Sequence, residues 1–191
     1  MQAQTIRAFI AIALPQEVTA VLAQLSHSFA KQLPNRAVRW VTPDRMHLTL
    51  RFLGDTAVTQ LATIATELDR ITAACAPFYL TLHEVGCFPN HKRPRVIWAG
   101  LAGDYRPLQD LKRDIDAFLL PMGWEREDQP FKAHFTLGRV NDARKLQQVQ
   151  WDMPVPEVGW QVTAVHLIES QLHPQGPLYT TRHTSPLHSQ S

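Results

Sequence analysis

Two four-residue segments of this sequence carry side chains that are suited to proton transfer. Residues His47–Leu50 read HLTL and residues His134–Leu137 read HFTL. Each segment lies in a stretch typical of a β-strand, where residues two apart point to the same face. Each therefore presents an imidazole and a hydroxyl on one face and two apolar side chains on the other. An unperturbed imidazole titrates near pH ~6.5, so it can donate or accept a proton around neutrality.

Two such strands that face one cleft would supply a general acid and a general base without a metal ion. Hydrolysis of a phosphodiester needs a base to take a proton from water and an acid to protonate the departing oxygen. Because the attack is in line, acid and base belong on opposite sides of the phosphorus, which histidines on separate strands allow. Thr49 and Thr136 are candidates for hydrogen bonds to the non-bridging phosphate oxygens; alternatively they are ordinary β-branched strand residues. The residues alone leave open which histidine is the acid.

Two arginines that follow the motifs are candidates for contacts with a phosphate. Strict alternation places Arg51 on the face of His47, although a solvated arginine at a strand end is an equal alternative. Alternation places Arg139 on the face opposite His134, unless Gly138 permits a bulge that brings it round.

Two aromatic residues are possible stacking surfaces for a nucleobase. These are Phe9 and Trp40, although packing in the core is the favoured role for Phe9. A basic loop over residues 91–95 (HKRPR) would also suit phosphate contacts and leaves open a non-catalytic RNA-binding module.

Composition indicates a soluble globular protein without covalent cross-links. The chain has 191 residues, 45% of them hydrophobic, which suits one domain or two small lobes around a cleft. A formal charge of +2 is compatible with a phosphate-bearing substrate. The two cysteines, Cys75 and Cys87, predict no disulfide framework and fit a reducing cytoplasm. No signal peptide and no apolar run of the ~20 residues that cross a membrane are expected.

The order of the expected elements predicts an α+β fold with antiparallel sheets. Apolar periodicity and turn residues predict helices from Pro15 to about 33, at about 57–74 and at about 105–120, with a short one at 142–149. Strands are expected at 5–14, 38–41, 47–53, 78–85, 95–101, 132–140, 160–172 and 178–183, ahead of a polar tail at 184–191. Each half holds a helix pattern and one motif strand, which indicates an internal duplication within a single domain of residues 1–191.

The segments around the two motifs resemble a known family in matching order along most of the chain. They are RAFIAI (7–12), HLTLRFLG (47–54), RVIWAG (95–100), HFTLGR (134–139) and GPLY (176–179). Together they resemble the bacterial RNA 2′,3′-cyclic phosphodiesterases of the 2H phosphoesterase superfamily, which are also called 2′-5′ RNA ligases or LigT-like proteins. One departure is Ala133, because the family commonly has proline before the second motif histidine.

The resemblance implies a bilobal, pseudo-twofold fold with two antiparallel sheets that face each other across a cleft and helices on the outside. It implies metal-independent hydrolysis of 2′,3′-cyclic phosphate ends of RNA to 2′-phosphates, without a cofactor, and a possible reverse 2′-5′ ligation. It assigns His47 as general acid, His134 as general base and Arg139 as a phosphate contact. The expected protein is a cytoplasmic monomer that binds RNA and no membrane.

Alternative interpretations keep the phosphodiester chemistry or replace it. The substrate could be a 2′-5′ oligonucleotide or a small cyclic nucleotide. A metal site is a weaker alternative: His83, Cys87 and His91 recur every four residues, but Gly86 and Pro89 argue against the helix that would align them, and no CxxC pair is present.

Overall fold

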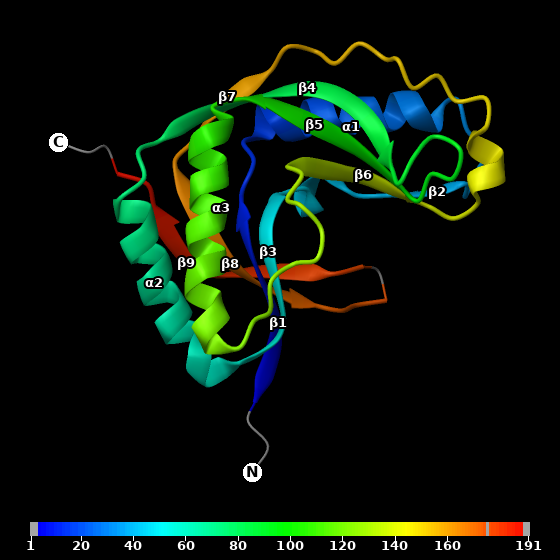
Figure 1. The fold of residues 1–191 in the computed structure, drawn as a ribbon. Helices are drawn as coiled ribbons and strands as arrows, with labels where there is room; N and C mark the ends of the chain where they lie inside the picture. The colour runs from blue at the N-terminus through cyan, green and yellow to red at the C-terminus, as the bar shows by residue number, and fades with distance from the viewer. Residues whose placement is uncertain (1–3, 175, 189–191) are drawn as a thin grey trace.

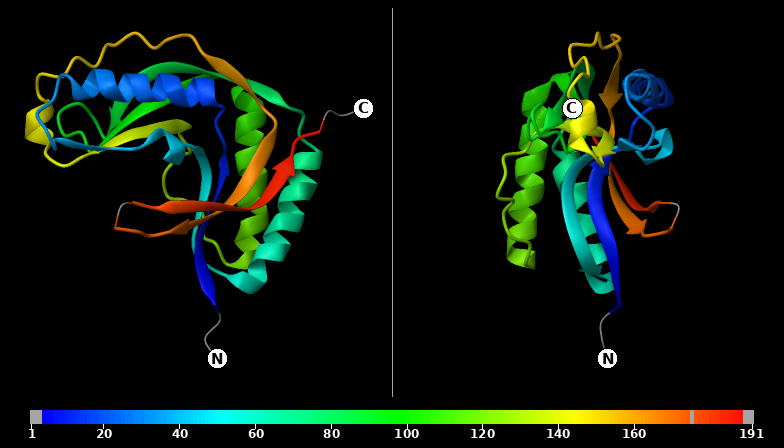
Figure 2. Two further views of the ribbon diagram at one scale, coloured as in Figure 1. Left: turned by 180° about the vertical axis from the view of Figure 1, so that it is seen from behind. Right: turned by 90° about the vertical axis from the view of Figure 1, so that its right-hand side faces the viewer.

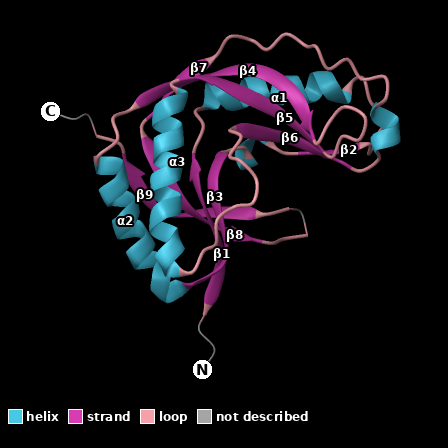
Figure 3. Cartoon of the chain, in the orientation of Figure 1, coloured by secondary structure: helices cyan, strands magenta, loops and turns pink. Residues whose placement is uncertain are grey.

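The computed structural model describes residues 4–174 and 176–188, which fold into two antiparallel sheets and three α-helices (Figures 1 and 3). In chain order the elements are β1 (Thr5–Ile12), α1 (Gln16–Ala30), β2 (Val38–Trp40), β3 (Leu48–Ala57), α2 (Leu61–Ala73), β4 (Phe78–Phe88), β5 (Val96–Gly103), α3 (Tyr105–Leu119), β6 (His134–Val140), β7 (Gly159–Val162), β8 (Ala164–Gln171) and β9 (Leu178–Pro186). Short 3-10 turns occur at Pro43–Arg45, Val58–Gln60, Leu120–Met122 and Ala143–Leu146.

The two sheets have closely related strand orders. One is four-stranded, in the order β3-β1-β8-β9, and the other is five-stranded, in the order β2-β6-β5-β4-β7. With the short β2 set aside, each sheet has four strands and carries its motif strand, β3 or β6, at one end. All the pairings are antiparallel. The predicted α+β fold with two antiparallel sheets is therefore confirmed.

The helices lie on the outside of the sheets. Helices α2 and α3 lie side by side against the four-stranded sheet, and α1 lies along the five-stranded sheet (Figures 1 and 2). Each helix buries an apolar stripe at helical spacing, as α3 does with Leu108, Leu111, Ile115 and Leu119. Burying such a side chain contributes about 1.5–3 kcal/mol. These stripes and both sheets contribute to one connected hydrophobic core.

The segment predicted as one strand at 160–172 is two strands in different sheets. Strand β7 pairs with β4, whereas β8 pairs with β1 and β9. The break falls at Thr163, whose carbonyl accepts a hydrogen bond of 2.8 Å from the Leu187 N–H. Because β-branched residues continue on both sides without Gly or Pro, the sequence gives no local signal for this change of sheet.

The predicted start of the polar tail, residue 184, is too early in the sequence. Strand β9 continues to Pro186, and Leu187 is buried. The polar residues mislead because Ser185 is buried and its Oγ donates to Asp69 Oδ1 of α2 at 2.7 Å. Residues 189–191 of the predicted tail lie outside the described residues. Across the described ranges, no helix combines the length and apolar character needed to span a membrane.

Candidate active site

A β-bulge in each motif strand decides which side chains share a face with the histidine. In β3, Thr49 pairs with Ala11 and Arg51 pairs with Ile10, so Leu50 is the extra residue. Arg51, four residues after His47, is thereby turned away from the face of His47. Phe52, five residues after His47, is turned onto that face.

Strand β6 contains the same bulge at the equivalent leucine. Thr136 pairs with Trp98 and Gly138 with Ile97, so Leu137 is the extra residue, and Arg139 pairs with Val96. Arg139, the fifth residue after His134, therefore lies on the face of Thr136 and His134. The bulge that Arg139 needs in order to share this face is therefore present.

Gly138 is needed for this geometry because its neighbours leave no room for a side chain. A Cβ at this position would lie 2.5 Å from Val38 Cγ1 and 2.9 Å from Trp40 Cε3. The same pairing places Trp40 opposite Gly138, on the face away from Arg139, where it packs against the core. Trp40 is therefore wrongly predicted as a stacking surface for a nucleobase.

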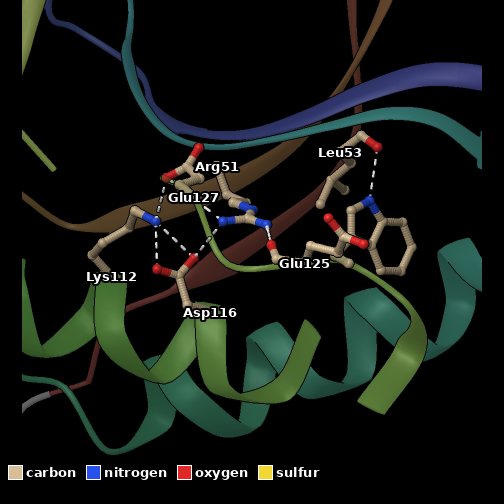
Figure 4. Close-up of polar contacts among 7 residues, drawn as sticks. Arg51, Leu53, Lys112, Asp116, Glu125 and Glu127 are labelled. Atoms are coloured by element: carbon tan, nitrogen blue, oxygen red, sulfur yellow. Dashed lines mark hydrogen bonds and ion pairs between the residues drawn. The ribbon is translucent and has the colours of Figure 1, made fainter. Parts of the chain in front are cut away.

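Arg51 is not on the site face, so the prediction that it contacts substrate is wrong. Its side chain is buried toward α3 and is 6% exposed. Its Nη1 lies 3.4 Å from Asp116 Oδ1 and 3.6 Å from Glu127 Oε2, and its Nη2 donates to the Glu125 carbonyl (Figure 4). The bulge at Leu50 is the physical reason, because strict alternation fails there.

His134 is held by a backbone hydrogen bond in one orientation. Its Nδ1 lies 2.7 Å from the Lys132 carbonyl oxygen. Because a carbonyl only accepts, Nδ1 carries the proton and Nε2 of the neutral ring is left to accept one. Burial lowers the His134 pKa, the Lys132 bond opposes that shift, and the charge of Arg139 lowers the pKa further.

His47 is enclosed by aromatic rings. Its imidazole stacks on Phe9 at a centroid distance of 4.6 Å and meets the edge of Tyr179 at 5.2 Å. Burial lowers its pKa to about 4, against the opposing effect of a hydrogen bond with the backbone of Arg45. Phe9 is only 3% exposed, which agrees with the favoured packing role and leaves little surface for a base.

Charges and ring contacts link the two motif strands at one site. Burial raises the pKa of the Tyr179 phenol, and the charges of Arg45 and Arg139 oppose that shift. Arg139 comes from the five-stranded sheet and also acts on His134, whereas Tyr179 comes from the four-stranded sheet and contacts His47. The two motifs therefore border a common region, beside the β8–β9 hairpin (Figure 2).

Sequence reasoning missed two residues of this region. Tyr179 lies in GPLY but gave no signal of its proximity to His47. Phe52 is 61% exposed, and its ring lies 6.1 Å from that of Phe9. The signal that could have found Phe52 is its position, five residues after its histidine, which matches that of Arg139.

The departure at Ala133 supplies a hydrogen bond. A bond with the backbone of Ala133 lowers the pKa of the Tyr105 phenol, against the larger effect of burial, which raises it. A bond that favours the phenolate comes from an N–H donor, which proline would lack. The residue before His134 is thus tied to the start of α3.

The residues considered for a metal site do not converge. His91 stacks on Trp151 with ring centroids 4.8 Å apart, and Cys87 is buried. Within residues 4–174 and 176–188, no group of three His, Cys, Asp or Glu side chains could hold a metal ion.

Comparison with known proteins gives the same family as the motifs. A family model described as LigT like Phosphoesterase matches residues 12–98 and 103–179. The RNA 2′,3′-cyclic phosphodiesterase of Thermus thermophilus is 34% identical over 182 residues, covering 91% of this chain and 86% of that protein. Its counterpart from Methanothermobacter thermautotrophicus is 30% identical over 179 residues, with coverage of 92% and 95%. The crystal structure of Escherichia coli LigT complexed with 3′-AMP superposes with a TM-score of 0.76 at 27% identity, covering 97% of this chain and 100% of that one.

Proposed function

The chain belongs to the LigT-like phosphoesterase family, and from that premise we propose that it opens 2′,3′-cyclic phosphodiesters at RNA 3′ ends to give 2′-phosphates. The observation that carries the proposal is the bulge that places Arg139 on the face of His134. The charge of Arg139 lowers the pKa of His134 and opposes the rise in the pKa of Tyr179, and Tyr179 contacts His47. Both imidazoles then border one anionic substrate. The relatives named RNA 2′,3′-cyclic phosphodiesterase supply the substrate class.

The proposed reaction uses His134 as base and His47 as acid. His134 Nε2 takes a proton from a water molecule, which attacks the phosphorus in line. The bond from phosphorus to the ribose 3′ oxygen breaks, and His47 protonates that oxygen, so the product keeps its phosphate on the 2′ oxygen. The tautomer fixed by the Lys132 carbonyl supports the base role of His134. In the reverse direction, a 2′-5′ ligation, the two roles exchange.

The acid role of His47 depends on the charge of the substrate. With a pKa of about 4 the imidazole is neutral at pH 7 in the free protein. A phosphate anion placed against it favours the charged form and raises that pKa. Thr49, Thr136 and Arg139 are proposed to bind the non-bridging oxygens, where charge develops in the transition state.

We also propose that residues 1–191 act as one bilobal domain and as a cytoplasmic monomer. The core shared between the two sheets supports a single folding unit, and the two unpaired thiols fit a reducing compartment. Light scattering after size exclusion tests the monomer, with a mass of 21.7 kDa expected.

The direct test uses a short RNA that ends in a 2′,3′-cyclic phosphate, incubated in EDTA with wild type, His47→Ala and His134→Ala. We expect wild type to open the ring, with the phosphate mapped to the 2′ position, and each variant to be slower by about a hundredfold to ten-thousandfold. If only a 2′-5′ oligonucleotide is cleaved, or only a small cyclic nucleotide is opened, that compound is the substrate instead. Retained RNA binding without turnover by any of the three proteins would support a binding module instead.

A further inference from the structure

Four charged side chains form a neutral cluster between β3 and α3, away from the site face. Lys112 Nζ lies 2.5 Å from Asp116 Oδ2 and 2.8 Å from Glu127 Oε2. Arg51 Nη1 approaches the same two carboxylates (Figure 4). Both cations are almost fully buried, with side chains only 5% and 6% exposed. Since unpaired buried charges are costly, the two carboxylates are needed to keep both cations in place.

The cluster joins three parts of the chain: strand β3, helix α3 and the irregular segment before His134. Arg51 follows the bulge of β3, two residues after Thr49. Lys112 and Asp116 lie on α3, whereas Glu127 lies on the segment 123–133, which has no helix or strand and runs directly into His134.

Further contacts hold the segment 123–133 against β3 near its start and against α3 near its end. Near its start, Trp124 Nε1 donates to the Leu53 carbonyl of β3 at 2.7 Å, and Arg51 binds the Glu125 carbonyl. Near its end, Lys112 Nζ lies 5.7 Å from the ring centroid of Phe131, three residues before His134. Strand β3, which follows His47, is thereby bound to the segment that leads to His134.

We propose that this cluster positions His134 relative to His47, with Arg51, Lys112 and Glu127 as positioning residues of the reaction proposed above, on which the inference rests. Irregular backbone without such contacts samples many conformations. In-line transfer requires acid and base on opposite sides of one phosphorus, so displacement of His134 by about 1 Å is enough to lower the rate by about a hundredfold.

Glu127→Gln is the sharpest variant, because it removes one charge with almost no change of volume and lies outside the core. Asp128→Asn, a change of the next and exposed carboxylate, is the matched control. We expect kcat on the cyclic phosphate RNA to fall roughly tenfold to a hundredfold with KM within about twofold of wild type. The control is expected to match wild type, with both variants folded by circular dichroism at the assay temperature.

A double variant separates a shared contact from two independent effects. If Arg51 and Glu127 act through one cluster, the loss of kcat in Arg51→Met/Glu127→Gln is expected to be smaller than the product of the two single losses, although Glu127 keeps its contact with Lys112 in Arg51→Met. Additive losses would overturn the linkage. A wild-type kcat in Glu127→Gln, or a raised KM with kcat unchanged, would equally overturn the proposal.

Amide hydrogen exchange supplies a readout that needs no substrate. We expect faster exchange across residues 124–137 in Glu127→Gln and not in Asp128→Asn. Unchanged exchange there would overturn the inference by itself. Failure of wild type to open any cyclic phosphate would refute the proposed function, while the exchange data would still decide whether the cluster fixes this segment.

Discussion

Phe9 lies stacked on the imidazole of His47, with ring centroids 4.6 Å apart and ring planes inclined by 27°. One face of the imidazole is therefore covered by Phe9, and the imidazole and the Tyr179 ring meet in an edge-to-face arrangement at 5.2 Å. Desolvation of this kind disfavours the charged imidazole, which is why the His47 pKa is lowered to about 4. The imidazole of the free protein is therefore neutral at pH 7.

The lowered pKa of His47 predicts a loss of stability in acid. Between pH 6.5 and 4 the unfolded chain protonates this histidine and the folded protein does not. Because the unfolded state then binds more protons, the free energy of unfolding falls as the pH falls, by about 3 kcal/mol over this window for His47 alone. Urea denaturation of wild type and His47→Gln at a series of pH values measures the difference. Parallel pH dependences for the two proteins would contradict the burial of a neutral His47.

Replacement of Arg139 is expected to lower activity and to raise the pKa of His134. Arg139→Gln removes the positive charge that lowers this pKa, along with the proposed phosphate contact. We expect kcat to fall about a hundredfold and the His134 titration, followed by NMR, to move to higher pH. Arg139→Lys, which keeps the charge, is expected to leave that titration close to wild type. An unmoved titration in Arg139→Gln would place Arg139 away from His134.

Phe52 is expected to contribute to substrate binding and little to stability. Its exposed ring sits on the site face beside Phe9, and stacking of a base on an aromatic ring is worth about 1–3 kcal/mol. Phe52→Ser should therefore raise KM for the RNA by roughly five- to a hundredfold with the melting temperature nearly unchanged. Tyr79→Ser on β4, another exposed aromatic, is the control. An unchanged KM in Phe52→Ser would show that the ring is only a surface residue.

Gly138→Ala is expected to destabilise the protein through the β6 bulge. The added methyl would lie 2.5 Å from Val38 Cγ1, so strand β2 or the bulge must move. Overpacking of this kind costs about 1–3 kcal/mol, and displacement of the bulge would also lower activity by moving Arg139. Thermal unfolding measures the cost, and a melting temperature equal to wild type would show that the strand yields freely.

The sequence predicted the site as far as period-two alternation holds. His47 with Thr49 and His134 with Thr136 share faces because each pair precedes the bulged leucine. Beyond Leu50 and Leu137 the alternation is reset. A bulge depends on pairing with a neighbouring strand, so no pattern within one motif places Arg51 against α3. Only comparison of the two motifs, which aligns Phe52 with Arg139, points to Phe52.

The fold class was predictable from the order of strands and helices, but the change of sheet at Thr163 was not. Strands β7 and β8 both mix buried apolar residues with polar ones, and only their partners, β4 and β1, distinguish them. The contacts of Tyr179 with His47 and Phe9 likewise depend on the pairing of β9 with β8 and of β8 with β1, which no local pattern predicts.

The pH dependence of kcat, measured in EDTA on an RNA with a 2′,3′-cyclic phosphate end, tests the two-histidine site most directly. We predict a bell for wild type, with loss of the acidic limb in His134→Ala, which removes the base, and of the alkaline limb in His47→Ala, which removes the acid. Turnover that requires an added divalent metal, or a wild-type bell retained in both variants, would contradict the account.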